Sequence, residues 1–187
     1  MSYPLLQKAI RYAAKLHEGQ DRDGENALPY ITHPIEVLGF LRKIGGVTDE
    51  EMLCAAVLHD VIEECGEKPK KLEEKFGKRV RDLVVELSRQ EPSPEQIKDL
   101  DEAQIWQLRA EMLLEEIGKM GPEAQTIKLA DRLSNVLDAL RTKEGEKLER
   151  YLWQSRRILE IVPREVNPGL WESVKASLPP AKKGKTR

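Results

Sequence analysis

Residues 54–64 read Cys-Ala-Ala-Val-Leu-His-Asp-Val-Ile-Glu-Glu, and this stretch decides how the chain folds. Small and aliphatic side chains fill the positions on both sides of His59 and Asp60, so the stretch is typical of a buried helix. An imidazole and a carboxylate next to each other in such a helix must both leave water, which costs free energy unless each finds a partner. The stretch therefore predicts a buried helix whose polar pair is retained for a function rather than for packing.

The residues on either side set the limits of this helix. Thr48 and Glu51 have the spacing of a capping box, in which each side chain binds the free backbone amide of the other residue. Gly66 is the expected end of the helix. On one continuous helix Cys54 and Cys65 would lie about 16 Å apart, because each residue adds about 1.5 Å. That separation is too large for a disulfide, so we expect two reduced thiols.

Elsewhere in the chain, apolar residues recur at spacings of three and four, and alternating β-branched runs are absent. This pattern predicts an all-α fold. The expected helices are Leu5 to His17, His33 to Gly45, a pair on either side of Phe76-Gly77, Ser93 to Gly121, Pro122 to Arg141, Tyr151 to Ile161 and Leu170 to Leu178. The expected core stripe of the helix at 122–141 is Ile127, Ala130, Leu133, Val136, Leu137 and Leu140. A polar loop, Glu18 to Pro29, separates the first two helices.

Length and composition limit the class of protein. A chain of 187 residues can bury one core of its own, and we expect a single domain at residues 1–178 followed by a basic, disordered tail at 179–187. The 31 basic and 33 acidic residues nearly balance, which gives no electrostatic reason to bind duplex nucleic acid. No apolar run approaches the roughly 20 residues that span a bilayer. The first residues also lack the features of a secretory signal, so we expect a cytoplasmic protein.

The His59-Asp60 pair has two interpretations. Glu63 and Glu64 follow one helical turn later, so a pair of carboxylates would extend over the same face and could hold water beside a metal ion. The alternative is a surface pair on an amphipathic helix, which is the ordinary explanation of an isolated His-Asp dipeptide. The cost of burying both side chains calls for a partner, but the dipeptide alone leaves both interpretations open.

Two other polar residues have the same ambiguity. Asp131 could be a metal ligand, or it could belong to a solvated polar stripe of its helix together with Lys128, Arg132 and Asn135. His33 precedes a proline at a predicted helix start, where a histidine often only binds the backbone. Neither residue taken alone predicts a site.

Three segments taken together resemble a known family. They are residues 30–34, Tyr-Ile-Thr-His-Pro; residues 58–64, Leu-His-Asp-Val-Ile-Glu-Glu; and residues 128–135, Lys-Leu-Ala-Asp-Arg-Leu-Ser-Asn. In order and approximate spacing they resemble the HD-domain hydrolases of the RelA/SpoT type, most closely the small stand-alone alarmone hydrolases. The resemblance extends over roughly residues 8–160. It implies an HD-domain helical bundle.

The resemblance also implies the roles of individual residues. The metal ligands would be His33, His59, Asp60 and Asp131. Glu63 and Glu64 would position and activate the attacking water. The substrate would be bound by Arg22, Lys128, Asn135 and Tyr151. A ligand set of nitrogen and oxygen atoms without thiolates suits manganese better than structural zinc, so we expect one Mn²⁺ ion. Arg132 could bind a phosphate or form a salt bridge on the helix surface.

The implied activity is metal-dependent hydrolysis of the 3′-diphosphate of guanosine 3′,5′-bis(diphosphate), ppGpp or pppGpp, to GDP or GTP and pyrophosphate. One alternative is a related phosphohydrolase that acts on another nucleotide, either an adenosine alarmone or a nucleoside monophosphate. A second alternative is a nucleotide sensor without turnover, and the intact set of ligands and carboxylates argues against it. The expected partner is in each case a small-molecule nucleotide. The sequence leaves the base, the native metal and the oligomeric state open.

The chain departs from the family pattern at two positions. Glu64 stands where the family commonly has aspartate, and the added methylene should preserve function. Asp23 follows Arg22 where the family usually has a second basic residue, which predicts weaker binding of a substrate with two diphosphates. His17 matches a recurrent family position, and we favour a structural role for it. We expect Trp106, Trp153 and Trp171 to lie in the core rather than to stack on a ligand.

Overall fold

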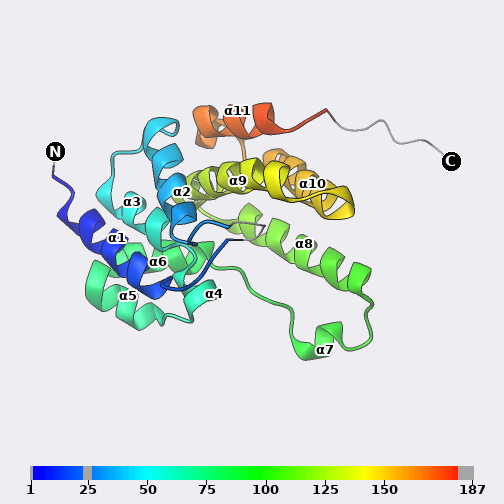
Figure 1. The fold of residues 1–187 in the computed structure, drawn as a ribbon, viewed down its shortest axis with the longest axis horizontal. Coiled ribbons are helices and arrows are strands. Elements are labelled where there is room, and N and C mark those ends of the chain that lie inside the picture. Colours follow the sequence, from blue (N-terminus) through cyan, green and yellow to red (C-terminus); the bar gives the residue numbers. More distant parts are fainter. Residues whose placement is uncertain (1, 23–26, 181–187) are drawn as a thin grey trace.

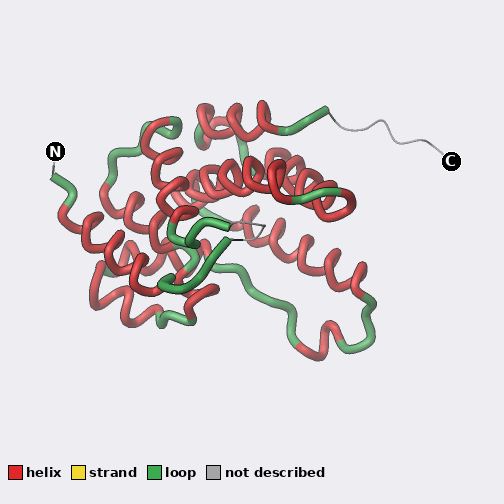
Figure 2. The backbone as a smooth tube through the Cα atoms, viewed as in Figure 1, coloured by secondary structure: helices red, strands yellow, loops and turns green. Residues whose placement is uncertain are grey.

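The computed structural model describes residues 2–22 and 27–180, and these are arranged as packed helices (Figure 1). The α-helices are α1 (Pro4–Leu16), α2 (Thr32–Lys43), α3 (Glu50–Leu58), α4 (Val61–Cys65), α5 (Pro69–Phe76), α6 (Lys78–Leu87), α7 (Pro94–Ile97), α8 (Glu102–Lys119), α9 (Pro122–Thr142), α10 (Gly145–Ile161) and α11 (Pro168–Ser177). A 3₁₀ helix, η1 (Arg164–Val166), precedes α11. Figure 2 shows no strand in the described ranges, where the extended pairing is one isolated bridge between Asp21 and Pro29. The all-α prediction is confirmed.

Helix α3 is the centre of the core. Its residues from Met52 to Leu58 are all buried, because a helix that is apolar around its whole circumference needs neighbours on every side. Helices α1, α2 and α6 supply those neighbours. The prediction of a buried helix immediately before His59 is therefore confirmed.

Helix α9 is the second buried helix. Pro122 occupies its first turn, where a missing amide hydrogen costs nothing, and residues from Ala124 to Ser134 are all buried. Helices α2, α10 and α11 pack against it, and Figure 1 shows α11 running along its upper side. Polar residues that α9 carries are thereby brought into the interior.

The segment from residue 49 to residue 66 is not the single helix that the sequence predicts. Helix α3 ends at Leu58, a turn follows at His59 and Asp60, and α4 starts at Val61. The predicted end is confirmed, because Gly66 caps α4 with a φ of 63°, a left-handed conformation that glycine adopts readily.

The start of α3 also differs from the prediction. Asp49, not Thr48, is the N-terminal cap, since its side chain accepts a hydrogen bond from the Met52 amide at 2.9 Å. The expectation of reduced thiols is confirmed, since Cys54 and Cys65 are both free. They lie on different helices, however, rather than on one.

Residues 93–121 form two helices instead of the predicted one. Ser93 does form a capping box with Gln96, but α7 ends only one residue later. Asp101 and Gln104 form a second capping box, which starts α8. The sequence contains a signal for this second cap, because an aspartate followed by a glutamine three residues later is also a capping-box pattern.

The core stripe of α9 is shorter than predicted. Ile127, Ala130, Leu133 and Val136 are buried, whereas Leu140 is 39% exposed because the packing neighbours do not cover the end of the helix. Of the predicted tail at 179–187, residues 181–187 lie outside the described residues. No described helix is both long enough and apolar enough to cross a membrane.

Candidate metal centre and active-site cavity

Side chains from three separate parts of the chain meet at one point. His33 comes from the first turn of α2, His59 and Asp60 from the turn between α3 and α4, and Asp131 from the buried part of α9. The Nε2 atom of His33 lies 3.5 Å from Asp60 Oδ2 and 3.3 Å from Asp131 Oδ1. The Nε2 atom of His59 lies 3.1 Å from Asp60 Oδ1 and 3.7 Å from Asp131 Oδ1. The structure thus brings all four predicted ligands together.

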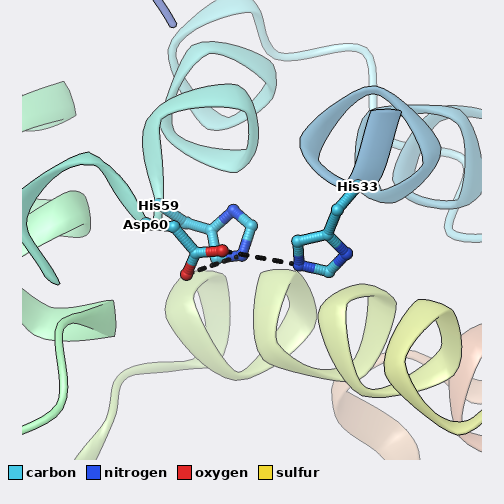
Figure 3. Close-up of side chains that lie close together, drawn as sticks. All are labelled: His33, His59 and Asp60. Atoms are coloured by element: carbon cyan, nitrogen blue, oxygen red, sulfur yellow. Dashed lines mark ion pairs between the residues drawn. The ribbon is translucent and has the colours of Figure 1, made fainter. Parts of the chain in front are cut away.

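The turn between α3 and α4 carries two of the four side chains. Adjacent side chains with a helical backbone diverge by about 100°, so an ion shared by His59 and Asp60 has to lie between them. Figure 3 shows both side chains leaving the turn and lying opposite His33. One potential ligand atom from each of these three residues lies within 4.8 Å of the others. The cluster therefore lies between this turn and the first turn of α2.

The donor atoms of the cluster fit a divalent cation. His59 is 1% exposed, and its Nδ1 lies 2.8 Å from the carbonyl oxygen of Ala56. Because a carbonyl only accepts hydrogen bonds, Nδ1 carries the proton and Nε2 faces the two carboxylates. This Nε2 atom is buried and forms no hydrogen bond. Two imidazole nitrogens and two carboxylates that face one another in the interior form a ligand set that a divalent metal would satisfy.

The charges of the cluster lead to the same conclusion. Burial opposes ionisation of Asp60 and Asp131, yet His59 beside Asp60 and Lys128 beside Asp131 hold the pKa of each carboxyl below its usual range. Burial also opposes the charge of His59, but the neighbouring carboxylates raise its pKa to about 10. The carboxylates thus require positive charge nearby, which a metal ion could supply in place of the proton on His59.

A cavity of about 520 Å³ opens from the cluster, and Glu63 and Glu64 line it. Glu63 accepts a hydrogen bond from the backbone amide of Arg89 at 2.6 Å, and the Arg89 guanidinium lies 3.8 Å away. Burial nevertheless raises the pKa of Glu63. A carboxylate with a raised pKa beside a metal-binding cluster is suited to accept and return a proton.

Basic side chains line the same cavity. Lys128 is buried, with its Nζ atom 3.0 Å from Asp131 Oδ2, and Arg132 is 5% exposed and lies 5.3 Å from the ring centroid of Tyr151. The alternative of a solvated polar stripe on α9 is therefore wrong, as is a surface salt bridge for Arg132. The remaining basic residues of the lining, which no sequence motif indicates, are Arg89, Arg109, Lys143, Lys147 and Arg150. The cavity is thus suited to an anionic ligand.

A second cavity of about 510 Å³ contains Arg22. The Arg22 guanidinium lies 3.3 Å from Asp138 and 3.7 Å from Glu36. The residues that border both cavities are Tyr30, His33, Glu64, Asn135, Lys143 and Tyr151. The predicted substrate residues are therefore divided, with Lys128 in the first cavity, Arg22 in the second, and Asn135 and Tyr151 bordering both. Asp23, next to Arg22, lies outside the described residues.

Tyr30 has a larger part in the site than its place in a sequence motif suggests. Its hydroxyl donates a hydrogen bond to Asp60 Oδ2 at 2.6 Å, and its ring stacks on His17 with centroids 4.7 Å apart. His17 is 2% exposed and its Nδ1 lies 2.7 Å from Gln20 Oε1. His17 thus packs behind Tyr30, which agrees with a structural role.

The three tryptophans do not share one environment. Trp171 packs on the core and donates hydrogen bonds to backbone carbonyls at the end of α10, so the prediction is confirmed there. Trp106 instead lines the first cavity, where the Arg150 guanidinium lies 4.8 Å from its ring centroid. Trp153 is 41% exposed and pairs with Trp106 at 5.6 Å. The core prediction is wrong for these two. Helical periodicity does not reveal that Trp106 lies on a side of α8 that borders a cavity, or that Trp153 lies on an exposed side of α10.

Comparison with known proteins places the chain in a family. The family model described as HD domain matches residues 9–158. The chain is 32% identical to guanosine-3′,5′-bis(diphosphate) 3′-pyrophosphohydrolase MESH1 of Xenopus tropicalis over 157 residues, covering 83% of this chain and 78% of that protein. It is 34% identical to the Homo sapiens protein of the same name, covering 83% and 77%.

A solved structure shows the same relationship. It is described as a metazoan ortholog of SpoT that hydrolyses ppGpp, and it superposes with a TM-score of 0.81 at 27% identity over 95% of each chain. The sequence resemblance, the family model and the fold agree with one another. The chain therefore belongs to the HD-domain family, in the RelA/SpoT-type group that contains the MESH1 proteins.

Proposed function

We propose that the protein is a metal-dependent hydrolase that removes the 3′-diphosphate of guanosine 3′,5′-bis(diphosphate), releasing pyrophosphate and GDP, or GTP from the pentaphosphate. One observation carries this proposal: His33, His59, Asp60 and Asp131 converge at the inner end of a cavity with basic walls. The names of the related MESH1 proteins specify this reaction.

We propose one Mn²⁺ ion as the metal, held by these four side chains. Nitrogen and carboxylate oxygen donors without a thiolate suit manganese, and four protein ligands leave open positions on a six-coordinate ion. When bound, such an ion would polarise a phosphoryl oxygen and make water more acidic. The remaining requirements of the reaction fall on the side chains of the cavity.

The two carboxylates on α4 would manage the proton of the attacking water. Water attacks the phosphorus next to the ribose, the bond from that phosphorus to O3′ breaks, and O3′ leaves as a hydroxyl after taking up a proton. Glu63, whose pKa burial raises, would take the proton of the water, and Glu64 would orient the water from the next position.

The basic residues would hold the diphosphate while it is transferred to water. Lys128 is close to the metal ligands, through its contact with Asp131 at 3.0 Å, so it would bind the inner phosphate. Arg132 and the other basic residues of the first cavity would bind the outer phosphate. The nucleoside would occupy the second cavity beside Arg22, with Asn135 and Tyr151 at the boundary.

A substrate panel tests the proposal. We expect guanosine tetraphosphate to give pyrophosphate in the presence of Mn²⁺, with little orthophosphate from GDP or GMP. Chelated protein should lose turnover and regain it when Mn²⁺ is restored. Orthophosphate release from GMP without attack on the tetraphosphate would instead assign the protein to nucleoside monophosphate hydrolysis. Undiminished turnover in metal-free protein would refute the role of the metal.

A further inference from the structure

Ser134 and Glu36 form a hydrogen-bonded chain behind His33. The Nδ1 atom of His33 lies 2.9 Å from Ser134 Oγ, and this hydroxyl donates a hydrogen bond to Glu36 Oε2 at 2.5 Å. Ser134 is completely buried and His33 is 3% exposed. The chain thus connects a candidate metal ligand on α2 to a serine on α9 and back to a carboxylate on α2.

The direction of these hydrogen bonds fixes the state of the imidazole. A serine hydroxyl has a single proton, and a carboxylate can only accept, so the Ser134 proton points to Glu36. Toward His33 the hydroxyl can then only accept, which places a proton on Nδ1. The opposite nitrogen, Nε2, is the one that faces Asp60 and Asp131 at 3.5 and 3.3 Å.

Helical spacing explains why each helix supplies both a ligand and its neighbour. His33 and Glu36 are three positions apart on α2, and Asp131 and Ser134 are three positions apart on α9. Residues at this spacing lie one above the other on a helix. Where α2 packs against α9, the ligands therefore meet on one level and the supporting residues on the next.

The other histidine of the cluster is supported differently. His59 directs its Nδ1 to the backbone carbonyl of Ala56 at 2.8 Å, an acceptor that every sequence would provide there. His33 depends instead on two side chains that substitution can remove. The outer end of this hydrogen-bonded series, Glu36, lies 3.7 Å from the guanidinium of Arg22.

We propose that Ser134 and Glu36 are positioning residues that hold His33 with its Nε2 lone pair directed at the metal ion. The proposal rests on the metal site described under the proposed function, but it does not depend on the identity of the substrate. Partners of this kind typically change metal affinity about 10–100-fold when they are removed. The competing explanation is that Ser134 and Glu36 only fasten α2 to α9, in which case their removal would lower stability and leave metal affinity unchanged.

Binding of Mn²⁺, measured by titration calorimetry on the metal-free full chain, separates these explanations. We expect Ser134→Ala to weaken Mn²⁺ binding about 10–100-fold and Glu36→Gln to weaken it by a smaller factor. Ser134→Thr keeps the hydroxyl and should restore binding to near the wild-type level. The matched control is Thr126→Val, which removes a buried hydroxyl of α9 that binds only the carbonyl of Pro122.

The tautomer of His33 is a second measurement, which a purely structural tie between the helices would not alter. In the wild-type chain, long-range ¹H–¹⁵N spectra should show the proton on Nδ1, and in Ser134→Ala this preference should be lost. Unchanged Mn²⁺ affinity in folded Ser134→Ala and Glu36→Gln would overturn the proposal. If Ser134→Ala fails to fold, the Mn²⁺ affinity of folded Glu36→Gln decides between the two explanations. A wild-type chain that binds no Mn²⁺ would refute the metal site itself.

Discussion

The hydroxyl of Tyr30 donates a hydrogen bond to Oδ2 of Asp60 at 2.6 Å, although 30 residues separate the two in sequence. Burial and the neighbouring Asp60 charge raise the pKa of Tyr30, so the phenol remains a donor throughout the neutral range. The hydrogen bond occupies one oxygen of Asp60 and thereby sets the orientation of the carboxylate. Residues in this position behind a ligand commonly contribute to metal affinity.

Tyr30→Phe should therefore weaken Mn²⁺ binding about 10-fold, at the lower end of the range for such partners. The fold should persist, because the ring that stacks on His17 is retained. Titration calorimetry measures the effect, and Tyr12→Phe is the control, since that hydroxyl binds Glu67 outside the cavity. Equal Mn²⁺ affinity in Tyr30→Phe and Tyr12→Phe would exclude an orienting role for Tyr30.

Substitution should distinguish the carboxylates proposed to bind the metal from those proposed to transfer protons. Asp60→Ala should lose bound Mn²⁺ and activity together, whereas Glu63→Gln should keep the metal and lose ~10²–10⁴-fold in kcat, because proton transfer commonly contributes that much. Metal content and turnover measured on the same samples check this. Near wild-type turnover in both Glu63→Gln and Glu64→Gln would mean that the pair is only a polar helix end.

The stability of α9 should follow the observed burial rather than the sequence periodicity. Leu133 is 3% exposed and Leu140 is 39% exposed, although both belong to the predicted core stripe. Leu133→Ala should lower the free energy of unfolding by about 2–5 kcal/mol, and Leu140→Ala by less than about 1 kcal/mol. Urea unfolding of the two variants measures the difference, and similar losses would contradict the boundary of the core.

The contact between Tyr12 and Glu67 should make stability depend on pH. Burial alone would raise the pKa of Glu67, but the Tyr12 hydrogen bond brings it below its usual value, while burial and Glu67 raise the pKa of Tyr12 to about 12. A lowered carboxyl pKa contributes stability above the unfolded pKa, and this contribution is lost as pH falls through the folded value. The raised pKa of the Tyr12 phenol contributes stability at pH values below the unfolded pKa. This contribution is lost as pH rises through about 12.

Tyr12→Phe should accordingly destabilise the protein by about 1.5 kcal/mol at neutral pH, because a hydrogen bond to a charged carboxylate is lost. This penalty should shrink between about pH 5 and about pH 3, as Glu67 is protonated. Urea unfolding of both proteins at the two ends of that range gives the comparison. A penalty that is independent of pH would show that the lost hydroxyl acts through packing alone.

The sequence predicts those parts of the fold that depend on local signals. Helices α1, α2 and α9 follow from apolar spacing and from prolines and glycines at their ends. The break at His59 and Asp60 could not be predicted in this way, because Val61 and Ile62 continue the apolar pattern across it. A turn inside a continuing apolar pattern depends on tertiary packing rather than on local propensity.

The residues of the candidate site likewise fall into those that a sequence motif reveals and those that only the packed structure reveals. The resemblance to a family indicates the candidate ligands and the carboxylates proposed to handle water, because these residue types are visible in a motif. The supporting residues Glu36 and Ser134 have no such signal, because they act only where α2 lies against α9. The basic lining from α8 and α10, including Arg109 and Arg150, is equally invisible, since charged residues at those positions resemble an ordinary solvated helix face.

Hydrolysis of guanosine tetraphosphate in ¹⁸O-labelled water, with Mn²⁺ present, tests the central claim most directly. Attack of water on the phosphorus next to the ribose places the new oxygen in the released diphosphate. Mass spectrometry should therefore find one ¹⁸O atom in pyrophosphate and none in GDP. Label in GDP, label in orthophosphate as the initial product, or the absence of pyrophosphate would contradict removal of the 3′-diphosphate by this metal centre.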